Sequence, residues 1–91
     1  MRSVNPFKII AAVEEYYHLP KGSIVKHNRS RTRVRARAVS VRLCRQLTDF
    51  TYSELGEFFE RDHSSLQHLN NKASKLLNVC KEIGEEILTK L

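Results

Sequence analysis

The spacing of apolar side chains predicts a series of helices joined by short loops. An N-cap followed by proline, Asn5-Pro6, opens a helix over residues 6–17, where apolar residues recur every three or four positions. Pro20 and Gly22 end this helix, because neither continues a regular helical pattern. At most a single helical turn is predicted at residues 23–26, before the next long helix.

The stretch RSRTRVRAR, residues 29–37, alternates strictly between arginine and smaller residues, which is formally the pattern of a strand. The chain offers no second strand candidate for pairing, and a lone strand is not stable. We therefore interpret residues 27–32 as a loop. Helical spacing from about Arg33 predicts a second long helix over residues 33–48.

Residues 51–54, TYSE, have the form of a capping box, which predicts a short helix ending at about Phe59. Asp62 has the position of the next N-cap, before a helix over residues 63–77. Two helices with so short a connection predict a helix-turn-helix over about residues 52–77, with the small Gly56 where they cross.

These elements predict an all-α domain of five to six helices with negligible sheet. At 91 residues the chain is expected to form one domain, residues 1–91. The residues expected in its core are Phe7, Ile10, Leu43, Leu47, Leu55, Phe59, Leu66 and Leu69.

A further apolar stripe, spaced by three and four, runs to the C-terminus. It either packs on the domain's own core, with a break near Asn78, or continues past Leu77 as a helix that binds a protein partner. Its members are Leu66, Leu69, Ala73, Leu76, Cys80, Ile83 and Ile87.

Basic charge is concentrated in one part of the chain. The net charge is +6, yet no acid lies between Glu15 and Asp49, a segment with nine lysines and arginines, while the rest carries seven cations and ten acids. A segment of one sign that is rich in arginine favours a polyanion such as nucleic acid. A solvated basic face and a membrane surface are the alternatives.

Other chemistries find little support. Cys44 and Cys80 lie in apolar helical patterns without a CxxC motif, which is typical of buried thiols in a cytoplasmic protein. His63 and Ser64 diverge by about 100° around a helix, and His63 and His68 are not at the spacing of a zinc pair. We expect no enzyme activity, metal, cofactor, small-molecule substrate or membrane span.

The cluster RDHSS, residues 61–65, stands at the start of the second helix of the predicted pair. The N-terminus of a helix attracts anions such as phosphate, and Arg61 adds positive charge there. Histidine and serine at the start of a recognition helix can reach base edges in the major groove. The cluster indicates contact with nucleic acid.

The segments AVEEYY, RSRTRVRARAVSVRLCRQLT and TYSELGEFFERDHSSLQH together resemble the C-terminal DNA-binding domain of the bacterial replication initiator DnaA, over about residues 9–77. The resemblance implies a TrpR-like helical domain that binds specific double-stranded DNA and is nucleoid-associated. The chain lacks a GxxxxGK[ST] loop, so we expect the initiator's ATPase domain to be absent from it. It would be the origin-binding domain of an initiator or a free-standing relative.

The resemblance also implies residue roles. Arg29 would enter the minor groove, while Arg37, Asp62, His63, Ser64 and Ser65 would face bases in the major groove. Ala38 stands where a base-contacting glutamine is common, and Glu60 replaces a turn that contains glycine. Arg31 and Arg35 are further candidates for DNA contact, and the positions that would touch phosphates are Arg45, Thr51, Tyr52, Ser53, Arg61 and His68.

Two alternatives to specific DNA binding stay open at this point. A non-specific nucleic-acid-binding protein, such as a phage or chromosomal regulator, would bind in a salt-dependent way without preferring a site. A protein-interaction module would use the C-terminal helix.

Overall fold

The computed structural model describes residues 4–26 and 30–90 and confirms the predicted all-α class: no strand occurs within these ranges. None of the helices described there is long and apolar enough to cross a membrane. The elements in chain order are α1 (Pro6–Tyr16), α2 (Arg31–Leu47), α3 (Tyr52–Phe59), α4 (His63–Lys72), the 3-10 segment η1 (Ala73–Leu76) and α5 (Leu77–Thr89).

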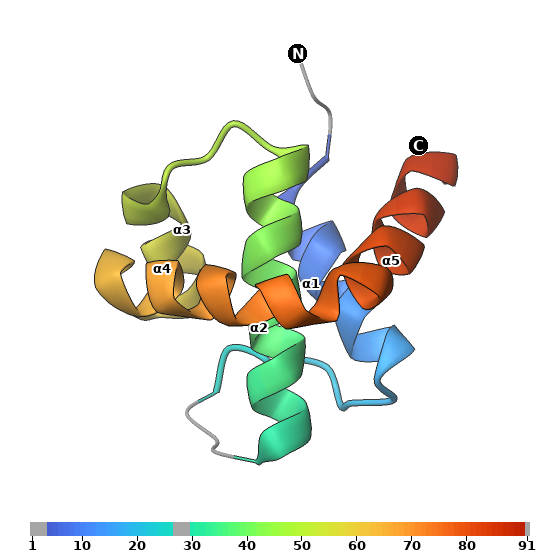
Figure 1. Ribbon diagram of the computed structural model, residues 1–91, viewed down its shortest axis with the longest axis horizontal. Helices are drawn as coiled ribbons and strands as arrows, with labels where there is room; N and C mark the ends of the chain where they lie inside the picture. Colours follow the sequence, from blue (N-terminus) through green and yellow to red (C-terminus); the bar gives the residue numbers. More distant parts are fainter. Residues whose placement is uncertain (1–3, 27–29, 91) are drawn as a thin grey trace.

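The long helix α2 forms the centre of the molecule (Figure 1). It packs against α1 and α5 on one side and against α4, which also contacts α3, on the other. The core between these helices is apolar, and its largest fully buried side chains include Phe59, Ile9, Leu43, Leu55, Leu66 and Ile83. Every helix therefore presents one face to α2 or to a neighbour of α2.

Helix α2 begins two residues earlier than the sequence pattern predicts. The hydroxyl of Ser30 accepts a hydrogen bond from the backbone N–H of Arg33 at 3.2 Å, which makes Ser30 the N-cap. Arg31 and Thr32 are consequently helical, and their interpretation as loop was wrong. The remaining loop residues, 27–29, lie outside the described residues.

The C-terminal stripe packs on the domain's own core. Helix α4 ends at Lys72, five residues before its predicted end, and η1 turns the chain into α5. The direction changes at Leu76, where φ is −122° and ψ is 32°, close to the break expected near Asn78. The buried members of the stripe are Leu66, Leu69, Ala73, Cys80, Ile83 and Ile87.

Two of the predicted core residues do not reach the interior. Leu47 is half-buried, and Phe7 is 64% exposed, so its assignment to the core was wrong. Helix α1 buries Ile9, Ile10 and Val13, which leaves Phe7 at the edge of the apolar stripe. Its ring lies on the surface, edge-on to the ring of Phe58 with centroids 4.9 Å apart.

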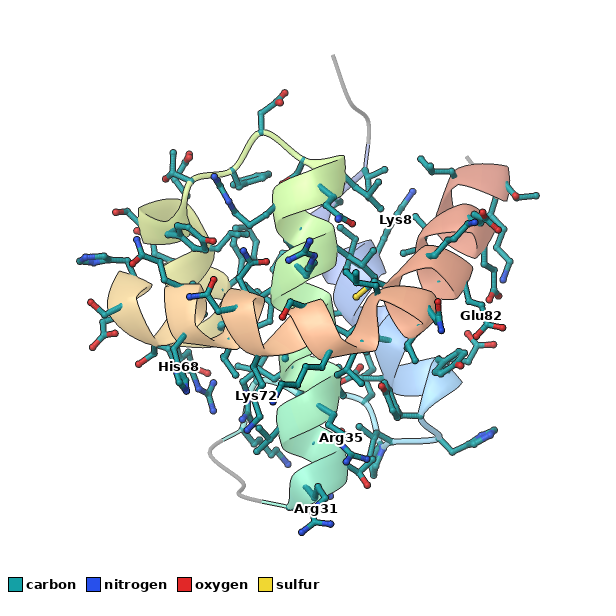
Figure 2. The ribbon with its side chains drawn as sticks, viewed as in Figure 1. Lys8, Arg31, Arg35, His68, Lys72 and Glu82 are labelled. Carbon is teal, nitrogen blue, oxygen red and sulfur yellow. The ribbon has the colours of Figure 1, made fainter. Side chains whose placement is uncertain are left out.

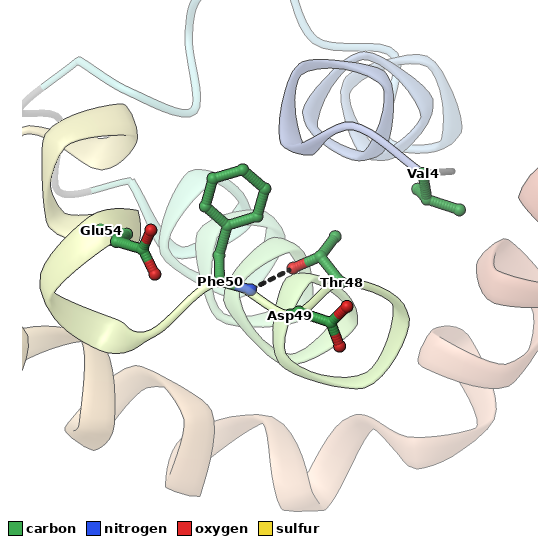
Figure 3. A pocket seen from close by; sticks show the side chains of 5 residues that line it. All are labelled: Val4, Thr48, Asp49, Phe50 and Glu54. Atoms are coloured by element: carbon green, nitrogen blue, oxygen red, sulfur yellow. Dashed lines mark hydrogen bonds between the residues drawn. The ribbon is translucent and has the colours of Figure 1, made fainter. Parts of the chain in front are cut away.

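The turn from α2 to α3 is fixed by two threonines. The hydroxyl of Thr48 donates to the carbonyl of Cys44. It also accepts from the N–H of Phe50 at 3.3 Å, as Figure 3 shows. Thr51 and Glu54 then form the predicted capping box, with both hydrogen bonds present. These side chains set the direction in which α3 starts.

The turn from α3 to α4 is tight and folds back over Gly56. Glu60 adopts a left-handed conformation, with φ of 54°, at the position where helices usually end on glycine. The backbone N–H of Arg61 donates to the carbonyl of Gly56 at 3.1 Å. A Cβ atom on Gly56 would lie 2.6 Å from the carbonyl oxygen of Arg61, so only glycine fits there without moving the turn.

Replacing Gly56 by alanine is therefore expected to lower the free energy of unfolding by about 1 to 3 kcal/mol, because backbone has to shift. Gly84→Ala is the matched control, since its Cβ would meet only the flexible Cδ2 of Leu43 at 3.3 Å. The better helix propensity of alanine, up to about 1 kcal/mol, offsets that contact. Urea denaturation measures both, and equal losses would contradict this account of the turn.

Candidate nucleic-acid interface

Asp62 caps the N-terminus of α4. Its Oδ1 accepts a hydrogen bond from the backbone N–H of Ser65 at 2.8 Å, and this bond lowers the pKa of the carboxyl group from its ordinary value. The carboxylate meets the positive end of the helix dipole. The predicted attraction of this helix end for phosphate is therefore partly satisfied within the chain, and additional positive charge has to come from side chains.

The side chains that follow the cap are free to touch a ligand. His63, Ser64 and Ser65 are all exposed on the first turn of α4. Ser64, Ser65 and His68 also line an open pocket of about 550 Å³, together with Arg37, Arg61 and Leu69. Short hydrogen-bonding side chains and two guanidinium groups thus share one hollow beside the start of α4.

Arg37 contributes charge to this pocket from a buried position. Its side chain donates from Nε to the carbonyl of Ile24 at 2.8 Å and from Nη2 to the carbonyl of Lys26 at 2.7 Å. Burial, and secondarily the charge of Arg61, lower the pKa of Arg37 to about 10, so the group stays protonated at neutral pH. The predicted contact of Arg37 with a base stays a prediction.

Arg61 is half-buried and bonded to backbone as well. Its Nη1 donates to the carbonyls of Val25 at 3.0 Å and Phe59 at 2.6 Å, and its Nη2 donates to that of Lys26 at 3.2 Å. Burial lowers the pKa of Arg61. A guanidinium engaged with three carbonyls is less available for the predicted phosphate contact than an exposed one.

Ala38 cannot serve as a DNA-contacting position in this structure. Its side chain has no exposed surface, because it lies on the face of α2 that packs into the core. Its inclusion among the predicted contact residues was wrong. Arg31 and Arg35, seven and three residues earlier on α2, are exposed.

Arg31 and Arg35 line a second pocket, of about 320 Å³, with Val34 and Lys72. Figure 2 shows His68, Lys72, Arg35 and Arg31 following one another from α4 to the start of α2. We call these four residues the basic surface. Lys72 is absent from the sequence-based candidates, although it stands four residues after His68 and eight after Ser64, on the same side of α4.

A third group gathers at the start of α3. The guanidinium of Arg45 donates from Nη1 to the carbonyl of Phe50 at 2.8 Å and lies 4.5 Å from the centre of the Tyr52 ring. Thr51 and Ser53 are exposed beside it. Their contact with phosphate stays a prediction, and Arg29, predicted to enter the minor groove, lies outside the described residues.

Acidic residues are placed mainly elsewhere. After α2, the acidic residues other than the Asp62 cap lie around α3 and along α5, where Glu86 pairs with Lys90 at 2.9 Å. Glu82, on α5, is separated from the basic surface in Figure 2. Within residues 4–26 and 30–90, no three histidine, cysteine or acidic side chains gather as metal ligands would. The basic surface thus lies apart from the acidic side chains of α5.

Comparison with known proteins gives a consistent result. Residues 6–73 match the family described as the bacterial DnaA protein helix-turn-helix. The chromosomal replication initiator protein DnaA of Cutibacterium acnes is 31% identical over 85 residues, or 92% of this chain. DnaA 2 of Chlamydia caviae is 40% identical over 63 residues, or 69% of this chain.

The chain spans only a small part of these relatives, 17% of the Cutibacterium protein and 14% of the Chlamydia protein. DnaA of Ruegeria is 31% identical over 87 residues, which are 94% of this chain and 18% of that protein. The match to the family covers α1 to the start of η1 and so includes both the pocket at α4 and the basic surface. The chain belongs to the bacterial DnaA helix-turn-helix family.

Proposed function

We propose that this chain binds a specific sequence of double-stranded DNA, with the start of α4 in the major groove. The observation that carries the proposal is the grouping of exposed His63, Ser64 and Ser65 with the guanidinium groups of Arg37 and Arg61 around one pocket. Short polar side chains at a helix start are suited to base edges, and buried cations strengthen the positive potential around them.

Phosphate contacts would come from both sides of that helix start. The basic surface extends along α4 and α2, and Arg45 with Thr51, Tyr52 and Ser53 stands at the start of α3. Such contacts fix the register of a protein on the duplex without reading sequence. Arg29 would add a contact in the minor groove.

The names of the relatives support a role in replication initiation, either as the origin-binding domain of an initiator or in a free-standing relative. The domain is proposed to act without catalysis of its own, in a nucleoid-associated protein of the cytoplasm. Residues 1–91 are proposed to form one DNA-binding domain, whose helix-turn-helix consists of α3 and α4.

Selection of bound duplexes from a random pool tests this function and identifies the site. We expect one enriched sequence, bound about 10³-fold or more tightly than a scrambled duplex at the same salt concentration. Binding that falls steeply with salt but enriches no sequence would establish the non-specific alternative instead. No retention of duplex at low salt would contradict DNA binding altogether.

A further inference from the structure

We propose that Arg61 is a positioning residue for DNA recognition: it fixes residues 24–26 against the start of α4 and does not serve as a phosphate contact. The proposal rests on the proposed function. It concerns the connection between α1 and α2, which lies far from α4 in sequence but touches the turn before it.

The hydrogen bonds of Arg61 bridge two parts of the chain. One, to the carbonyl of Phe59, stays within the turn between α3 and α4, while two others reach Val25 and Lys26, about 35 residues earlier. A single planar guanidinium thus joins the turn that starts α4 to residues 25 and 26 of the connection between α1 and α2. Arginine suits this task because its donors point in fixed, divergent directions.

The same segment is held from two other helices. From α2, Arg37 donates to the carbonyls of Ile24 and Lys26, so the carbonyl of Lys26 accepts from both arginines. From α1, the buried carboxylate of Glu14 accepts from the N–H groups of Gly22 at 2.7 Å and Ile24 at 3.3 Å. Charged side chains therefore engage both donors and acceptors of this backbone.

The hydrogen bonds of Arg61 connect the two parts of the chain that are predicted to read DNA, the segment before Arg29 and the start of α4. Lys26 is three residues before Arg29 along the chain, and the turn held by Arg61 is followed at once by Asp62 and His63. Because the side chain of Arg61 is bonded to both parts, the start of α4 and residues 25 and 26 keep a fixed spacing. Loss of that spacing would weaken recognition of the site without removing any phosphate contact.

Arg61→Lys separates positioning from phosphate binding. Lysine keeps the positive charge and can hold a phosphate, but its ammonium is a point donor that cannot span three separate carbonyls. We expect Arg61→Lys to lower affinity for the selected duplex about ten- to a hundredfold, on the scale of hydrogen bonds to charged groups, with an unchanged salt dependence. Arg61→Gln should behave in the same way.

Arg31 supplies the matched control, since it is an exposed arginine of the basic surface. Arg31→Lys should bind nearly as the parent does, and Arg31→Gln should reduce the slope of log affinity against log salt by about one unit. If Arg61 variants follow this pattern, with lysine tolerated and glutamine reducing the slope, Arg61 holds phosphate and the proposal is wrong.

A measurement on the parent protein removes dependence on how well the variants fold. Nuclear magnetic resonance of the guanidinium protons of Arg61 should show slow exchange with water in the free protein and in the complex, because the carbonyl bonds persist. Exchange that becomes fast on binding, or a coupling to phosphorus, would overturn the proposal. A parent without site preference would instead overturn the proposed function, and with it this role.

Discussion

Phe59→Ala is expected to lower the free energy of unfolding by about 3 to 5 kcal/mol, enough to remove much of the stability of a domain of this size. Phe59 is the largest fully buried side chain of the described residues. It stands on the last turn of α3, next to the turn that orients α4. Its loss would leave a cavity where α3 packs on its neighbours.

Phe7→Ala is the matched control, because the same side chain is removed from a position that is 64% exposed. We expect a loss of about 1 kcal/mol, which corresponds to its edge-on contact with Phe58. Guanidinium denaturation followed by circular dichroism measures both variants. A cost for Phe7→Ala as large as that for Phe59→Ala would place Phe7 in the core and contradict the structure.

Local hydrogen-bonding signals were the most reliable guide to this fold. The Asn5 cap, the capping box of Thr51 and Glu54, and the Asp62 cap all depend on side chains within three residues of the amides that they bind. Such signals are readable from sequence because the partners are neighbours. They predicted where α1, α3 and α4 begin.

The start of α2 at Arg31 was not predicted, although its N-cap is equally local. Alternation between arginine and small residues concealed the cap at Ser30, although arginine itself favours helix. The end of α4 depends on packing, because η1 has to turn the chain so that Cys80 and Ile83 reach the core. Periodicity alone extends a helix for as long as the spacing lasts.

The sequence predicted which exposed residues of α4 belong to the interface, but it did not predict which residues of α2 are buried. Exposed His63, Ser64 and Ser65 followed from their place after an N-cap. The burial of Arg37 and Ala38 did not, since it depends on carbonyls of the preceding connection and on the packing of α2. The resemblance assigned Arg37, Arg45 and Arg61 to DNA, whereas all three donate hydrogen bonds to backbone carbonyls.

His63→Ala and Ser64→Ala should each remove about 1 to 3 kcal/mol of preference between the selected and the scrambled duplex. Both side chains are exposed on the first turn of α4, so they can approach base edges once the helix lies in the major groove. Affinity for random DNA should be nearly unchanged, because neither substitution removes a cation of the basic surface. The double variant should lose most of its ability to distinguish the site.

We expect the His63→Ala and Ser64→Ala variants to fold as the parent does, so a loss of preference between the duplexes would not come from misfolding. Alanine has a higher helix propensity than histidine or serine, and the Asp62 cap bonds to the N–H of Ser65 rather than to either side chain. Thermal melts of the variants should therefore match the parent. Ser74→Ala, an exposed serine on η1 outside the pocket, controls for the loss of a surface hydroxyl.

Parallel titrations of the selected and scrambled duplexes at one salt concentration separate the possible outcomes. Reduced preference with unchanged random binding identifies His63 and Ser64 as base-reading residues. An equal fall for both duplexes would assign them to the DNA backbone. If both variants keep the full preference of the parent, α4 is not the reading element, and the arginines of α2 and the preceding loop have to distinguish the site.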